Sequence, residues 1–149
     1  MTEFLETTVD KFTFKVAAGR YYTAEGLWAS ADGASVRVGL SDYLQQRSGD
    51  VAFAEVKPAG TTLAEGDELA MIETIKVNVS LSSPVSGRIA AVNPALENAP
   101  EIINQDPYGD GWLAVIETGD WPAAQAHLLT AQAYFEQMKE QAEQDVKKL

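Results

Sequence analysis

The stretch Met71-Ile-Glu-Thr-Ile-Lys-Val-Asn-Val-Ser80 places one lysine between two runs rich in apolar and β-branched residues. Such runs, over Glu68–Thr74 and Val77–Leu81, predict two strands of a hairpin whose turn carries Lys76. A long, flexible side chain at a hairpin tip is accessible to a modifying enzyme or a partner. Most surface lysines are only solvated charges, so Lys76 becomes a candidate site only through its sequence context.

The surrounding sequence has the same character, because short predicted strands alternate with turn residues. Further strands are predicted at residues 12–16, 51–56, 88–92 and 112–116. An Asp-Gly pair in Ala31-Asp-Gly-Ala34 lies between two more strand-like runs and predicts another hairpin. Many short strands with frequent turns are typical of a mainly β fold of the sandwich or barrel type.

Two helices are expected in addition to the strands. Residues 41–48 predict a short internal helix with Ser41 as its N-cap and Gly49 at its end. Beyond Asp120, a second predicted N-cap, apolar residues recur at intervals of three and four to the end of the chain. This pattern predicts one long C-terminal helix over about residues 121–148.

The length and charge of the chain limit its class. With 149 residues, it is expected to form a single domain over residues 1–149, with its core over about 12–118. The formal net charge is −11, which disfavours binding to nucleic acid and to anionic membrane surfaces. No apolar run approaches the roughly 18 residues that a membrane-spanning helix requires. We therefore expect no nucleic-acid partner and no membrane insertion.

The reactive residue types that the chain lacks also exclude several kinds of enzyme and metal site. There is no cysteine and one histidine, His127, so cysteine-ligated metal sites, thiolate nucleophiles and histidine-rich metal cages are excluded. The acidic first ten residues have neither a basic region nor an apolar region of a secretory signal. We therefore expect no metal, no catalytic residues and a cytoplasmic location.

Several motifs together resemble the glycine cleavage H-protein family, in order and with compatible spacing over about residues 21–118. The motifs are Gly49-Asp-Val-Ala-Phe, Gly66-Asp67, Ile72-Glu-Thr-Ile-Lys76, Ser82-Ser-Pro-Val-Ser-Gly87, Val92-Asn-Pro-Ala-Leu-Glu97, Asp106-Pro-Tyr-Gly-Asp-Gly-Trp112 and, less closely, Tyr22-Thr-Ala-Glu-Gly-Leu-Trp28. The resemblance implies a barrel-sandwich-hybrid lipoyl domain with lipoic acid amide-linked to Lys76. It also implies a non-enzymatic carrier whose swinging arm visits several active sites.

Four positions depart from the family pattern. The family's His-Glu pair before the tryptophan corresponds to Gly26 and Leu27 here, a second histidine corresponds to Arg47, and an acidic residue after the lipoyl lysine corresponds to Ser80. In the family these polar groups shelter an arm that carries a cationic aminomethyl group, and carboxylates hold such a cation by charge. Their replacement suggests a different load.

Three functions follow from these motifs and departures. The departures favour the H-like lipoate-binding proteins of heterodisulfide-reductase-like sulfur oxidation, which also resemble this chain. The alternative is a glycine cleavage H protein, which carries the aminomethyl group from glycine decarboxylase to aminomethyltransferase. A second alternative is an unmodified H-like interaction module.

The two carrier functions imply a common set of partners and one set that differs. A lipoate-attaching enzyme and dihydrolipoamide dehydrogenase are expected in both cases. The remaining partner is either a heterodisulfide-reductase-like complex or the glycine cleavage proteins. Because the chain is acidic, basic docking surfaces are expected on these partners.

Overall fold

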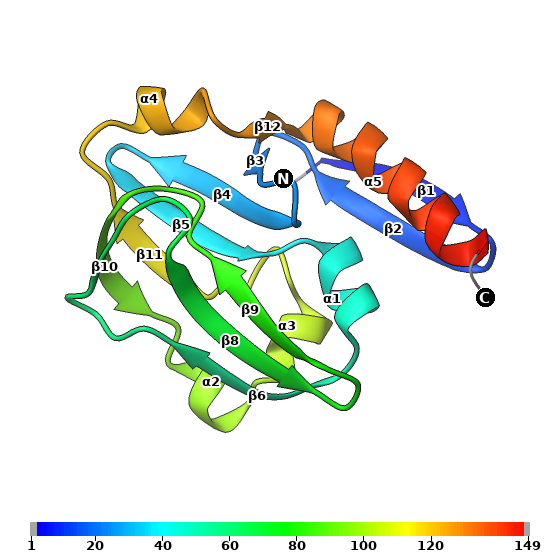
Figure 1. The fold of residues 1–149 in the computed structure, drawn as a ribbon, viewed down its shortest axis with the longest axis horizontal. Coiled ribbons are helices and arrows are strands. Elements are labelled where there is room, and N and C mark those ends of the chain that lie inside the picture. Colours follow the sequence, from blue (N-terminus) through cyan, green and yellow to red (C-terminus); the bar gives the residue numbers. More distant parts are fainter. Residues whose placement is uncertain (1–2, 148–149) are drawn as a thin grey trace.

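The computed structural model describes residues 3–147 and shows a mainly β fold in which three antiparallel sheets carry five helices (Figure 1). In chain order the strands are β1 Phe4–Val9, β2 Phe12–Ala17, β3 Tyr21–Tyr22, β4 Leu27–Asp32, β5 Ser35–Leu40, β6 Val51–Val56, β7 Thr62–Leu63, β8 Glu68–Thr74, β9 Asn78–Ser82, β10 Gly87–Val92, β11 Ala114–Glu117 and β12 Leu129–Thr130. The helices are α1 Asp42–Ser48, α2 Ala95–Asn98, α3 Ile102–Gln105, α4 Trp121–Gln125 and α5 Ala131–Lys147. The mainly β class predicted from the sequence is confirmed.

The main core lies between two of the sheets. One sheet has seven strands in the order β12-β3-β4-β5-β11-β10-β7, and the other has three in the order β6-β8-β9. Apolar side chains from both meet in one cluster, which includes Leu27 and Ile116 from the first sheet and Ile72 and Leu81 from the second. Neither sheet closes on itself, so the fold is an open sandwich.

A second core forms where the C-terminal helix crosses the N-terminal hairpin. Strands β1 and β2 pair with each other and lie alongside α5, so that segments from both ends of the chain are neighbours (Figure 1). Phe14, Tyr22, Trp28, Tyr134 and Met138 are buried there, and the rings of Tyr22 and Tyr134 stack with centroids 4.6 Å apart. The core therefore extends past the predicted limit of residue 118 and includes side chains of α5.

The local predictions around the internal helix are confirmed. Strands β4 and β5 form the predicted hairpin, and Gly33 in its turn has a φ of +64°, which glycine adopts without strain. The Ser41 hydroxyl accepts a hydrogen bond from the Leu44 amide at the start of α1, and Gly49 ends the helix with a φ of +96°. This end brings the chain directly into β6.

The predicted continuous helix over 121–148 is wrong in its first part. Helix α4, whose N-cap is Asp120 as predicted, ends at Gln125, and residues 129–130 then pair as β12 with β3. The edge strand β3 offers backbone groups that this pairing satisfies, and the Thr130 hydroxyl accepts a hydrogen bond from the Ala133 amide to start α5 afresh. The predicted last helical residue, Lys148, lies outside the described residues.

Several elements and the start of one strand also differ from the sequence prediction. Strand β1, strand β7 and the single-turn helices α2 and α3 were not expected. Strand β11 begins at Ala114 rather than at 112, because the Trp112 carbonyl accepts a hydrogen bond from the Asn93 side chain before the ladder starts. None of the helices within residues 3–147 has both the length and the apolar character needed to span a bilayer.

Candidate functional site: the hairpin lysine and two grooves beside it

The turn between β8 and β9 presents Lys76 at its tip, as the sequence predicts. Met71 pairs with Ser80 and Glu73 with Asn78, so the ladder runs to the last residues before the turn. The Thr74 hydroxyl accepts hydrogen bonds from the amides of Lys76 (3.1 Å) and Val77 (3.0 Å). It also lies within hydrogen-bonding distance of the Val77 carbonyl, at 3.0 Å. This side chain organises the turn together with the backbone hydrogen bond that the Thr74 amide donates to the Val77 carbonyl.

The tip is exposed and apolar apart from its lysine. Ile75 and Val77, on either side of Lys76, are 76% and 48% exposed. The Ile75 amide donates a hydrogen bond to the Asp50 carbonyl at 3.2 Å, which ties the tip to the segment entering β6. Within residues 3–147, no carboxylate forms an ion pair with the Lys76 ammonium. The Lys76 side chain is therefore accessible to a modifying enzyme, and within this range no ion pair has to be broken before its amine reacts.

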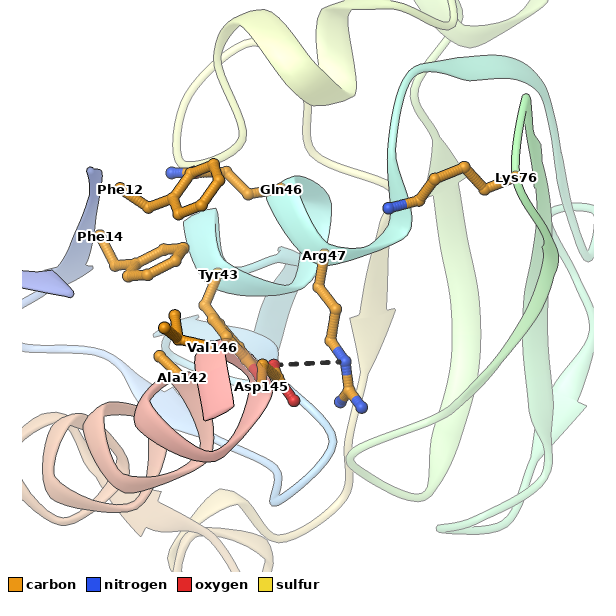
Figure 2. A pocket seen from close by; sticks show the side chains of 9 residues that line it. All are labelled: Phe12, Phe14, Tyr43, Gln46, Arg47, Lys76, Ala142, Asp145 and Val146. Carbon is orange, nitrogen blue, oxygen red and sulfur yellow. Dashed lines mark hydrogen bonds and ion pairs between the residues drawn. The ribbon is translucent and has the colours of Figure 1, made fainter. Parts of the chain in front are cut away.

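Gly49 gives the Lys76 side chain a path along the end of α1. A Cβ atom at position 49 would lie 3.3 Å from Lys76 Cε, which is tighter than ordinary contact, and 3.5 Å from its Cγ. The lysine side chain therefore lies against bare backbone and is directed toward α1 rather than outward from the tip (Figure 2).

Two grooves flank the C-terminal half of α1. The first, here called the aromatic groove, has a volume of about 290 Å³. Its lining residues are Phe12, Phe14, Tyr43, Gln46, Arg47, Lys76, Ala142, Asp145 and Val146 (Figure 2). The second, here called the inner groove, has a volume of about 240 Å³ and lies among α1, β9, α5 and the segment Ala24–Glu25.

Tyr43 and Arg47 line both grooves and so form the wall between them. Both contact Asp145 of α5: the Tyr43 hydroxyl donates a hydrogen bond to its carboxylate, and Arg47 Nε lies 3.8 Å from its Oδ2. Burial, followed by the hydrogen bond to Asp145, raises the pKa of Tyr43 well above its usual range. The wall thus links α1 to the last turns of α5.

The positions that depart from the family pattern do not converge on one site. Arg47 lies in the wall between the grooves, whereas Leu27 is completely buried in the main core. Ser80 does not line either groove, although its neighbours Val79 and Leu81 line the inner one. Its hydroxyl donates a hydrogen bond of 2.6 Å to Glu68, which lowers the pKa of that carboxyl. The expectation that these replacements together remove one binding pocket is therefore wrong.

The fourth departure, Gly26, has a structural reason. Its φ is +107°, and a Cβ atom there would lie 3.1 Å from both Leu44 Cβ and the Tyr134 hydroxyl. That hydroxyl lies 2.9 Å from the Ser41 Oγ, so the two share a buried hydrogen bond. Tyr134 of α5 thus occupies the space that a larger side chain at position 26 would need.

Glu25 is a site residue that the sequence reasoning missed. It lines the inner groove, where its carboxylate accepts a hydrogen bond of 3.1 Å from the Ser82 amide. Glu25 lies within the motif Tyr22–Trp28, two positions before the buried Leu27, so the sequence did contain an acidic residue next to the expected position. The inner groove thus has a carboxylate, supplied by a different position from the one expected.

Residues 20–141 match the family described as Glycine cleavage H-protein. The chain belongs to the glycine cleavage H-protein family. Members of this family are lipoyl carriers rather than catalysts, and they hold lipoate covalently on a lysine, as the resemblance implied. The bare, accessible Lys76 side chain at a rigid hairpin tip fits that attachment.

Curated relatives and a solved structure agree with this membership. The chain is 39% identical over 127 residues to a probable glycine cleavage system H protein of Thermococcus kodakarensis, covering 85% of this chain and 94% of that protein. It is 44% identical over 117 residues to the glycine cleavage system H protein of Chlorobium limicola, covering 77% and 91%. The crystal structure of a glycine cleavage system H protein from Mycobacterium marinum superposes with a TM-score of 0.70 at 35% identity, covering 79% and 94%.

Proposed function

We propose that this chain is the lipoyl carrier of a glycine cleavage system, with lipoate amide-linked to Lys76. The observation that carries the proposal is the position of Lys76 at the exposed tip of a hairpin whose turn Thr74 organises, with no ion-pair partner among residues 3–147. When bound, the lipoyl group would supply a disulfide that accepts the aminomethyl group as glycine loses carbon dioxide, so that one sulfur bonds the carbon and the other becomes a thiol. The proposed partners are a lipoate-attaching enzyme, glycine decarboxylase, aminomethyltransferase and lipoamide dehydrogenase.

The chain's own residues present the arm and provide a place for its charge. The β8–β9 hairpin presents Lys76 at its tip. The exposed Ile75 and Val77 provide apolar surface on either side of it that a modifying enzyme can contact. Glu25 places a carboxylate on the inner groove, where a protonated amine would be held by charge. Arg47 also lines this groove, so Glu25 is the group there that can hold a cationic load by charge.

This proposal replaces the sequence-based preference for sulfur oxidation. That preference depended on Leu27, Arg47 and Ser80 acting as one altered pocket, and these residues lie in three different environments. The relatives cited above are glycine cleavage H proteins. No contact in residues 3–147 favours a heterodisulfide-reductase-like complex as the partner or an unmodified interaction module.

The attachment site is tested by mass. After co-expression with a lipoate ligase, the intact mass should rise by one lipoyl group, and Lys76→Arg should abolish the increase. Lys57→Arg is the matched control, because Lys57 is also an exposed lysine beside a strand end and should leave the increase unchanged. Modification of another lysine, or no modification by any lipoylating enzyme, would refute the proposal.

The load is tested separately with lipoylated protein. The protein should support glycine–bicarbonate exchange by glycine decarboxylase at a rate comparable to an established H protein. Normal lipoylation with negligible exchange would exclude the glycine cleavage function. The preferred function would then be that of a lipoyl carrier in sulfur oxidation.

A further inference from the structure

The aromatic groove is built largely from segments that the family match does not include. Phe12 and Phe14 precede residue 20, and Ala142, Asp145 and Val146 follow residue 141. Strand β2 and the last turns of α5 thus add a groove to the family fold, on the side of the wall away from the inner groove.

This groove is held in shape by polar contacts around its rim. The Gln46 side chain donates a hydrogen bond of 2.9 Å to the Thr13 carbonyl, and Asp42 accepts one of 2.9 Å from the Lys15 amide. Both bonds fix the β1–β2 hairpin on α1. The opening therefore exists before anything enters it, so that the groove itself does not have to be ordered when it is filled.

Most of the lining surface is apolar or aromatic and part of it is exposed, although Gln46, Arg47, Lys76 and Asp145 also line the groove. The rings of Phe12 and Phe14 are stacked with centroids 6.3 Å apart, and Phe14 meets Tyr43 edge-on at 5.3 Å. Phe12 remains 40% exposed, although it is a large apolar side chain. An apolar occupant would remove this surface from water, which is favourable.

Of the residues in the β8–β9 hairpin, Lys76 lies closest to the aromatic groove. Its side chain lines the groove, and its nitrogen points toward α1, beyond which the phenylalanines lie (Figure 2). Amidation removes the charge of that nitrogen and so removes the cost of placing it near apolar groups. The ring at the end of a lipoyl chain is neutral and contains two sulfur atoms, and sulfur contacts aromatic rings favourably.

We propose that the aromatic groove is the resting site of the lipoyl group on Lys76. The inference rests on the proposed lipoylation of that lysine. A volume of about 290 Å³ suits a small ring and a short chain. The inner groove is less apolar and carries Glu25, whereas the carboxylate of the aromatic groove, Asp145, is engaged by Tyr43 and Arg47, so that the unloaded arm and a cationic load have different places. In the groove the disulfide is shielded from reductants until a partner withdraws it.

The position of the arm is tested by NMR on the full-length protein with and without the lipoyl group. We expect nuclear Overhauser effects between the ring protons of the lipoyl group and the aromatic protons of Phe12 and Phe14. Chemical shifts of Val146 should change as well. Changes confined to residues 74–78, or centred on Val79 and Met138 of the inner groove, would overturn the inference while leaving the lipoylation of Lys76 intact.

Reduction of the disulfide by a water-soluble phosphine gives a second readout without any partner enzyme. The phosphine is oxidised, with the oxygen of one water, as the disulfide becomes two thiols. Phe12→Ser should accelerate this reduction by about three- to tenfold, because a shielding contact is lost. Phe4→Ser is the matched control, since Phe4 lies on the same hairpin, is 43% exposed and does not line the groove. Equal rates for wild type and Phe12→Ser would refute the resting site, and absence of the lipoyl group by mass would refute both proposals.

Discussion

At the scale of single residues, the chain has a carboxylate two positions before the one at which the family pattern has it. A carboxylate at position 27 would lie in the main core, where Leu27 is fully enclosed by apolar side chains. An unpaired charge buried in this way is costly. Glu25, two residues earlier, supplies a carboxylate to the inner groove while its oxygen also accepts the Ser82 amide. Gly26 between them leaves room for the Tyr134 hydroxyl.

Glu25→Gln tests the role of this charge. The amide oxygen of glutamine still accepts the Ser82 hydrogen bond, so the local structure should persist. The half-life of the aminomethylated protein should fall by about tenfold or more, since one charge-assisted contact contributes on the order of 1.5–3 kcal/mol. The measurement is release of the bound aminomethyl group over time. Glu55→Gln, an exposed substitution on β6, is the control, and equal half-lives for Glu25→Gln and this control would contradict the prediction.

At the scale of elements, the β8–β9 hairpin depends on one hydroxyl. Thr74 is the last residue of β8, and it accepts the amides of the two residues that follow Ile75. The remaining tip residues are exposed and make few other restraining contacts, so the side chain of Thr74 sets the direction in which Lys76 leaves the sheet.

Thr74→Val should therefore reduce the efficiency of lipoylation without unfolding the protein. Valine keeps the size and the β-branch of threonine but removes its hydroxyl, and hydrogen bonds of this kind contribute roughly 0.5–1.5 kcal/mol each. We expect about a fivefold lower rate of lipoyl transfer by a lipoate ligase. Thr74→Ser retains the hydroxyl and should restore most of the rate. If the valine variant is modified as fast as wild type, the hydroxyl does not organise the tip.

At the scale of the whole molecule, the second core joins the two ends of the chain through buried tyrosines. Burial raises the pKa values of Tyr22, Tyr43, Tyr108 and Tyr134 above the usual range for this side chain. Their hydroxyls bind partners in distant segments, among them the Lys15 carbonyl, Ser41 and Asp145. The folded state therefore favours the neutral, protonated form of each hydroxyl.

Stability should consequently decrease at high pH. In the unfolded chain these tyrosines lose their protons near pH ~10, whereas in the folded protein they remain protonated to higher pH. Above that pH the unfolded state binds fewer protons, so the free energy of unfolding falls by up to about 1.4 kcal/mol per pH unit for each tyrosine. Urea unfolding measured on both sides of pH ~10 checks this sign. Tyr43→Phe should flatten the decrease, and an unchanged urea midpoint across the range would refute it.

The elements near the lysine were predictable because their signals are local. Strands β6 and β8 have the predicted bounds, and the Asp-Gly turn and the Ser41 cap form as expected. Each depends on alternation or on one capping residue within a few positions of the chain. The break between α4 and α5 has no such strong local signal, because it depends on pairing with β3, about a hundred residues away in sequence.

The sequence by itself determined the mainly β class, the family resemblance and the hairpin with Lys76 at its tip, since periodicity and contiguous motifs encode them. Only the tertiary structure decided which side chains surround that lysine. Leu27 lies in the main core, Glu25 lines the inner groove, and Phe12 and Val146 line the same groove beside α1. These positions follow from packing between segments that are distant in the chain, and no local pattern of residues records which of them will become neighbours.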